Sequence, residues 1–197
     1  MSPKKAGSID GPHLREAARW EYVGYALQYY AAARFAYFAG SSPVTGSLFH
    51  HAVEFLLKQR LIVRLTPEVL SRKPYGHDLE RLWKEFKAGV ADAALDRFDT
   101  AIAELHRFED IRYPENLYRR GATFQFILKR EHVGPPGMLG TRPLPSYNVA
   151  LEEADDLMLV LFDKCSVNLP AFAWHFRGCA GEYLLKENPG LEAAMKK

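Results

Sequence analysis

The sequence predicts an all-α protein: an antiparallel bundle of four to five helices, with an irregular insertion of some β character before the fifth helix. Three observations lead to this prediction. Apolar residues recur at helical spacing over several long segments. Glycine, proline and serine clusters separate these segments. Between residues 111 and 147 the helical pattern is lost in a stretch rich in glycine and proline.

Composition places the chain among single-domain proteins without a membrane span. Its 197 residues are 48% hydrophobic, which is enough for one buried core. The formal net charge of +2 neither requires nor excludes a polyanionic partner. Cys165 and Cys179 form no CxxC pair, so neither a disulfide framework nor a cysteine zinc site is indicated. No apolar run resembles a signal peptide or a transmembrane helix, and we expect a reducing, cytoplasmic location.

The first half of the predicted domain is helical. Residues 1–12 are rich in Gly, Pro, Ser and Lys and predict a disordered segment. The helical bundle should occupy residues 13–167 and open with a long helix that ends at Gly40. The second helix should begin at Pro43 or Ser47 and end near Leu65, antiparallel to the first.

The second half contains the insertion. We expect a third helix from Asp78 to about Ala88 and a fourth from about Asp92 to Asp110. Within the insertion of about residues 111–147, the alternating run "TFQFILK" predicts a strand or one arm of a hairpin. A fifth helix should begin near Asn148, and residues 168–197 should form a C-terminal helical extension.

The second predicted helix carries a narrow polar wedge. Its stretch "SLFHHAVEFLLKQRLIV" is apolar around most of its circumference, which predicts burial. His50, His51, Glu54 and Lys58 interrupt it in adjacent turns, with His50–Glu54 and Glu54–Lys58 each four residues apart. We expect a hydrophilic rim of a buried helix that also forms the wall of a cleft. A carboxylate and an imidazole at this spacing can share a metal ion. No ExxH motif completes a di-iron set, and we predict no metal and no cofactor.

Familiar catalytic motifs are missing from the chain. There is no GxSxG, GxxxxGK[ST], GxGxxG after a strand, or HExxH, which leaves hydrolase, P-loop, dinucleotide-binding and zinc-protease functions without their motif. Both cysteines fit small buried apolar residues better than nucleophiles.

The insertion combines basic and aromatic residues. Aromatic rings are interleaved with six basic residues: Tyr113, Tyr118, Phe124 and Phe126 with Arg112, Arg119, Arg120, Lys129, Arg130 and Arg142. Such a surface can hold phosphates on its cations and stack bases on its rings. Five acidic residues between Glu152 and Asp163, with no Lys or Arg among them, offer an alternative docking partner for these cations. Both interpretations remain open on the sequence.

The order of these elements resembles HEPN domains, the helical bundles of higher eukaryote and prokaryote nucleotide-binding proteins. The stretches that carry the resemblance are "YALQYYAAARFAYFAG", "SLFHHAVEFLLKQRLIV", "GHDLERLW" and "RYPENL", and it spans roughly residues 14–165. The resemblance implies a homodimer that binds RNA, a nucleotide or a nucleotidyltransferase-type partner protein in a toxin–antitoxin or defence system. The first helix offers an aromatic face for such an interface: Tyr22, Tyr25, Tyr29, Tyr30, Phe35, Tyr37 and Phe38.

Many HEPN proteins are ribonucleases with an Arg-x4-6-His motif near the last bundle helix. Here the only match is Arg72 to His77, on the loop before the third predicted helix. His77 also fits a plain helix start, in which Asp78 caps free backbone N–H groups. We therefore expect a non-catalytic module that binds through the following residues: His50, Glu54, Lys58, Arg112, Arg119, Arg120, Lys129 and Arg130. The alternatives are a metal-independent ribonuclease using Arg72 and His77, or a purely structural interaction protein.

Overall fold

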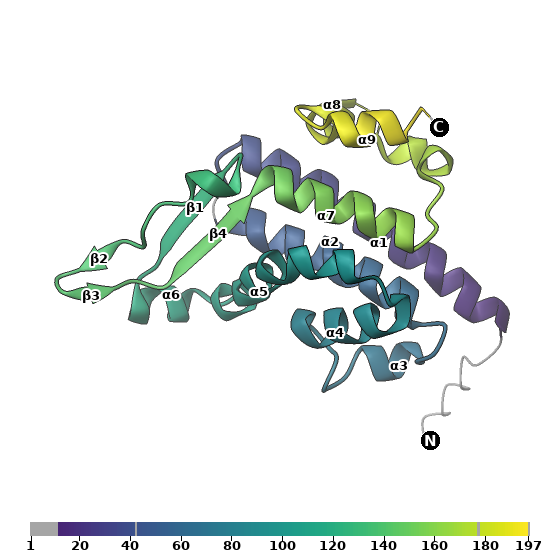
Figure 1. The fold of residues 1–197 in the computed structure, drawn as a ribbon, viewed down its shortest axis with the longest axis horizontal. Helices are drawn as coiled ribbons and strands as arrows, with labels where there is room; N and C mark the ends of the chain where they lie inside the picture. The colour runs from purple at the N-terminus through teal and green to yellow at the C-terminus, as the bar shows by residue number, and fades with distance from the viewer. Residues whose placement is uncertain (1–11, 42, 177, 197) are drawn as a thin grey trace, which may run out of the picture.

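The computed structural model describes residues 12–41, 43–176 and 178–196. Within these ranges the protein is mostly helical and carries two small two-stranded sheets, which confirms the helical class (Figure 1). None of the described helices is long and apolar enough to cross a membrane. The predicted disordered segment covers residues 1–12, of which residues 1–11 lie outside the described parts of the chain.

Helices α1 (Pro12–Phe38) and α2 (Val44–Leu61) form the expected antiparallel pair and pack along their length. On α1 the buried face runs through Val23, Leu27 and Tyr30. From the predicted aromatic face, Tyr25 and Phe35 are about half exposed. Small and aromatic residues surround α1 on every side, so the sequence pattern alone does not say which stripe packs against α2.

Two further helices cover α2. Helix α4 (Leu79–Val90) matches the third predicted helix, and the Asp78 side chain accepts a hydrogen bond from the Arg81 backbone N–H as expected. The fourth predicted helix is divided: α5 (Asp99–Arg107) lies between two 3₁₀ turns, Ala93–Phe98 and Phe108–Ile111. The short helix α3 (Pro67–Leu70), which the sequence analysis missed, precedes α4.

The insertion folds as an arm that extends away from the helices (left in Figure 1). It holds α6 (Pro114–Arg120), β1 (Thr123–Ile127), β2 (Met138–Leu139), β3 (Arg142–Pro143) and β4 (Ser146–Ala150). The predicted strand is β1, but it pairs in parallel with β4 rather than with a hairpin partner, in the register Thr123↔Ser146. The hairpin in this arm is β2–β3.

Helix α7 (Leu151–Lys164) begins slightly later than predicted, because residues 148–150 belong to β4. The C-terminal segment contains a 3₁₀ segment (Leu169–Phe176), α8 (Gly178–Leu185) and α9 (Pro189–Ala194). It packs on α1 around Arg34, whose guanidinium donates to Asp155 of α7 and to the backbone carbonyls of Tyr183 and Lys186. Helix α2 contacts α1, α4, α5 and α7, so it lies inside the bundle.

Candidate functional site

The polar wedge of α2 is buried. His50 and Glu54 are each 1% exposed and Lys58 is 6% exposed, so the prediction of a hydrophilic rim is wrong for these three residues. Helices α4 and α5 close over α2, and the loop before α4 contributes the His77 side chain to the wedge. These long-range contacts have no local signature in the sequence of α2.

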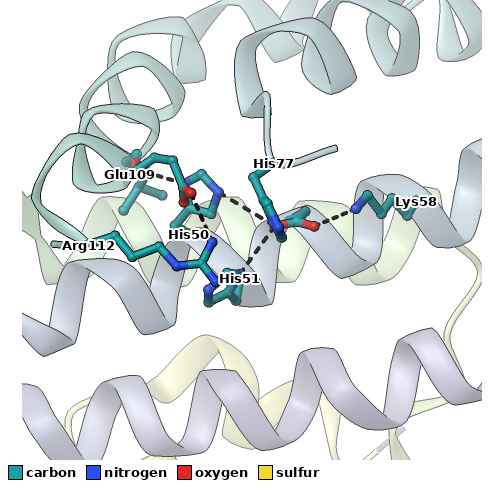
Figure 2. Close-up of polar contacts among 8 residues, drawn as sticks. His50, His51, Lys58, His77, Glu109 and Arg112 are labelled. Atoms are coloured by element: carbon teal, nitrogen blue, oxygen red, sulfur yellow. Dashed lines mark hydrogen bonds and ion pairs between the residues drawn. The ribbon is translucent and has the colours of Figure 1, made fainter. Parts of the chain in front are cut away.

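Four basic groups surround the single carboxylate of Glu54. Its Oε2 lies 3.2 Å from His51 Nδ1, 3.0 Å from His77 Nδ1 and 3.5 Å from His50 Nε2. Its Oε1 accepts a hydrogen bond of 2.5 Å from Lys58 Nζ. Figure 2 shows the rings of His50, His51 and His77 turned toward one another, with Lys58 approaching from the opposite side. We call these five residues the Glu54 cluster.

His50 is fixed from behind by α5. Its Nδ1 lies 3.1 Å from the Leu105 carbonyl oxygen, which can only accept, so Nδ1 carries the hydrogen. The other nitrogen, Nε2, lies 3.5 Å from Glu54 Oε2. It donates to the carboxylate when the ring is protonated and presents a lone pair there when the ring is neutral. This buried Nε2 has no hydrogen-bond partner within the described part of the chain.

The electrostatics keep Glu54 ionised. Burial raises the pKa of the Glu54 carboxyl, but its contacts with His50 and His51 and the charge of Lys58 outweigh burial and hold that pKa well below the usual range. The effect of the carboxylate reaches α1, where burial, followed by the Glu54 charge, raises the pKa of Tyr22. Arg112 also feels Glu54, although its 3.1 Å contact with Glu109 is the main cause of its raised pKa.

The predicted basic residues of the insertion separate into two groups. Arg130 docks on acidic neighbours, contacting Glu104 and Glu153, as the alternative interpretation expected. Arg112 pairs with Glu109, and Lys129 is exposed. Phe124 and Phe126 are half-buried, so they are not free to stack on bases as the first interpretation expected.

The remaining group is exposed: Tyr118, Arg119 and Arg120 lie on α6, Tyr113 directly precedes it, and Arg142 lies on β3. Tyr118 is 93% exposed and Tyr113 is 63% exposed. Arg119 and Arg120 make no ion pair with any residue that the structure describes, and the guanidinium of Arg142 donates to the Arg120 carbonyl at 3.0 Å. We call these five residues the α6 surface.

The candidate ribonuclease pair lies on one turn. The Arg72 carbonyl accepts the backbone N–H groups of Tyr75 and Gly76, both at 2.9 Å, which folds the loop back toward α4. The Arg72 side chain is exposed and forms no ion pair in the described ranges. The His77 side chain is 48% exposed and contacts Glu54.

The two cysteines differ. Cys165 is buried, and its thiol donates to the Leu56 carbonyl at 3.3 Å. Cys179 is exposed, so the prediction that both thiols are buried is wrong for Cys179, which lies on the first turn of α8.

Comparisons with protein-family models, with curated proteins and with solved structures give no match to this chain. The resemblance to HEPN domains therefore stays a prediction that rests on the quoted residues. Function must be argued from the Glu54 cluster and the α6 surface themselves.

Proposed function

We propose that this chain is a HEPN-like binding module without catalytic activity, and that single-stranded RNA binds its α6 surface. The observation that supports this proposal is the exposure of Tyr118 directly beside Arg119 and Arg120. An exposed ring offers a face on which any base can stack, and unpaired guanidinium groups beside it can neutralise the neighbouring phosphates. The predicted contribution of His50, Glu54 and Lys58 is left out of this surface because these residues are buried.

The α6 surface is small. Its helix has seven residues, which corresponds to a length of about 10 Å at ~1.5 Å per residue. One copy therefore contacts only a few nucleotides, and we expect weak binding that depends strongly on salt. The homodimer implied by the HEPN resemblance would present two such surfaces to one strand and strengthen binding through effective concentration.

Fluorescence anisotropy with a labelled uridine-rich single strand, measured over a range of salt concentrations, tests the proposal. For Tyr118→Ala we expect about 5- to 150-fold weaker binding, the equivalent of ~1–3 kcal/mol for one lost stacking contact. For the double variant Arg119→Ala/Arg120→Ala we expect the slope of log K against log salt to fall in magnitude by about 1.4, or ~0.7 per phosphate contact.

Lys84→Ala is the matched control, because Lys84 is an exposed cation on α4, away from the α6 surface. It should leave both affinity and salt slope unchanged. Affinity that is insensitive to salt, or equal in the wild type and Tyr118→Ala, would contradict the proposal. Complete competition by a mononucleotide would identify a nucleotide, rather than a strand, as the ligand.

A metal-independent ribonuclease is the second candidate, favoured by the contact between His77 and Glu54. A carboxylate that orients a half-exposed imidazole is the arrangement of a general base. A denaturing gel of mixed-sequence RNA, incubated in EDTA with the wild type or with His77→Ala, tests it. Cleavage that disappears in the variant would support the ribonuclease, whereas intact RNA in both lanes would leave the non-catalytic proposal standing.

A further inference from the structure

We propose that the Glu54 cluster binds a divalent transition-metal ion of the Zn²⁺ type, with His50 Nε2, His51 Nδ1 and Glu54 Oε2 as its three preformed ligands. The half-exposed His77 becomes the fourth ligand by moving toward the ion. This inference does not depend on RNA binding, because none of these residues belongs to the α6 surface. It goes beyond the sequence-based expectation, which was that the chain holds no metal.

The spacing of three ligand atoms suits one metal ion. Ligand atoms of His50, His51 and Glu54 all lie within 4.8 Å of one another. Ligands about 2.0–2.1 Å from a tetrahedral zinc ion are separated by about 3.3 Å. His50 Nε2 and His51 Nδ1 lie 3.5 and 3.2 Å from Glu54 Oε2, close to this separation. His77 Nδ1 lies 3.0 Å from the same oxygen but outside the group of mutually close ligand atoms, so its side chain must shift to complete a tetrahedron.

The orientation of His50 is the second observation. Histidines that bind metals usually donate their other ring N–H to a carbonyl or carboxylate, which fixes the tautomer. His50 has this arrangement, with Nδ1 donating to the Leu105 carbonyl and a buried Nε2 that lacks a hydrogen-bond partner among the described residues. An unpaired buried nitrogen has a free-energy cost that a bound ion would remove.

The surrounding charges leave one carboxylate oxygen for the ion. Lys58 holds Oε1 of Glu54, so Oε2 is the oxygen that faces the three imidazoles. Glu109 partly neutralises the nearby Arg112. Imidazole nitrogens with a single carboxylate and no thiolate suit Zn²⁺, Co²⁺ or Ni²⁺ better than Mg²⁺ or Ca²⁺, which prefer oxygen ligands.

His77 differs from the other ligands because it comes from the loop before α4 and is half exposed. We assign it as the ligand beside which the ion enters. To bind the ion, His51 and His77 must carry their hydrogen on Nε2 rather than on the Nδ1 that faces Glu54. A bound ion would then connect this loop to α2.

Titration of the metal-free full-length protein with Co²⁺ tests the site, because four-coordinate Co²⁺ absorbs visible light far more strongly than six-coordinate Co²⁺. We expect one ion per chain with a four-coordinate spectrum, and displacement by Zn²⁺. Competition with a chromophoric chelator then measures Zn²⁺ affinity. Loss of a residue that only supports a ligand lowers metal affinity about 10- to 100-fold. His51→Gln and Glu54→Gln remove ligands themselves, so each should lower Zn²⁺ affinity at least ~100-fold.

His132→Gln is the control, because His132 is an exposed histidine beside Glu131 in the arm and should leave Zn²⁺ affinity unchanged. For His77→Gln we expect weaker binding with a spectrum that stays four-coordinate, since water can replace the lost ligand. Affinity equal to that of the wild type in His77→Gln would overturn the assignment of His77.

A measurement on the wild type avoids variants that fail to fold. Ring ¹⁵N resonances of the histidines should shift on addition of one equivalent of Zn²⁺ for His50, His51 and His77, and stay in place for His132. A wild-type protein whose histidine resonances and Co²⁺ spectrum do not respond to metal would overturn the proposal.

Discussion

The protein buries charged groups in two places, around Arg34 and in the Glu54 cluster, and the two differ in how fully their hydrogen bonds are satisfied. Around Arg34 every strong donor meets an acceptor: the guanidinium contacts Asp155 and the carbonyls of Tyr183 and Lys186. Tyr30 donates to Asp155 at 2.7 Å, and Asn188 donates to the Tyr30 hydroxyl at 2.7 Å. In the Glu54 cluster, by contrast, three imidazoles and an ammonium converge on one carboxylate, and His50 Nε2 makes no hydrogen bond to the described residues.

The difference separates a structural role from a binding role. Buried polar networks that are fully satisfied stabilise one arrangement of the elements, and the Arg34 network holds α1, α7 and the C-terminal segment together. In the Glu54 cluster the lone pair of His50 Nε2 meets no hydrogen-bond donor among the described residues, and a metal ion would accept it. Substitutions in the two regions should therefore have different consequences, one mainly for stability and one mainly for ligand affinity.

The largest expected effect is that of Arg34→Met. Removing one partner of a buried ion pair leaves the other charge uncompensated, and we expect a loss of about 3–5 kcal/mol in the free energy of unfolding. Urea denaturation at neutral pH measures it. Arg97→Met is the matched control, because its ion pair with Asp156, the neighbour of Asp155 on α7, is exposed and should contribute at most ~1 kcal/mol.

The loss of stability in Arg34→Met should also depend on pH. Burial raises the pKa of Asp155 above its usual value even though Arg34 and Tyr30 act to lower it, and loss of Arg34 should raise it further. The folded chain then binds this proton more tightly than the unfolded chain, so stability increases as the pH falls toward the ordinary pKa of aspartate, about 3.9. The deficit of Arg34→Met should shrink over this range; a constant deficit would contradict the assigned cause.

A smaller effect is expected from Gly46→Ala. A Cβ at Gly46 of α2 would lie 2.1 Å from the Phe108 ring, so the turn after α5 must move away from α2 at a cost of about 1–3 kcal/mol. Because Leu105 of α5 holds His50, the variant should also weaken Zn²⁺ binding, by about tenfold, as loss of a supporting contact does. Thermal unfolding and chelator competition measure the two effects.

Gly134→Ala is the control for Gly46→Ala, because its nearest neighbour is an ordinary van der Waals contact at 3.5 Å. If Gly46→Ala lowers stability without changing Zn²⁺ affinity, the position of α5 does not govern the cluster. If it changes neither, Phe108 adjusts without cost and α2 and α5 are less tightly packed than the structure indicates.

Local sequence patterns predicted the helices but not their buried charges. Periodicity located α1, α2, α4 and α7 within a few residues, because each has a long apolar stripe. The beginning of α7 was misplaced, since Asn148 pairs with Gln125 in a parallel sheet whose partner strand is far away in the sequence. Arg34 went unnoticed because its acceptors lie about 120 to 150 positions away.

Local sequence patterns also predicted only the part of the Glu54 cluster that lies on α2. His50, His51, Glu54 and Lys58 share one face of α2, and helical spacing brings them together in the sequence. His77 is 23 positions from Glu54, and nothing in the spacing of α2 indicates it. Burial was missed because it depends on α4 and α5, whose packing against α2 is a tertiary property.

The smallest expected effect on stability is that of a cysteine substitution. The same substitution makes it possible to measure local unfolding near the Arg34 network and near the Glu54 cluster separately. Burial raises the pKa of Cys165 to about 12, so a thiol reagent at mildly alkaline pH should label only Cys179 in the folded protein. Cys179→Ser should abolish this fast reaction and change stability by no more than ~0.5 kcal/mol. Cys165 follows α7, the helix that carries Asp155, and its thiol contacts the Leu56 carbonyl of α2.

Slow labelling of Cys165 therefore reports separation of α7 from α2. In the Cys179→Ser background, Arg34→Met should accelerate it strongly, because the Arg34 network holds α7 in place. His51→Gln should leave the rate close to that of the parent, because His51 is partly exposed and contacts Glu54 rather than α7. Equal acceleration by both substitutions would mean that the two regions open as one unit, and the contrast between them would then concern ligand binding alone.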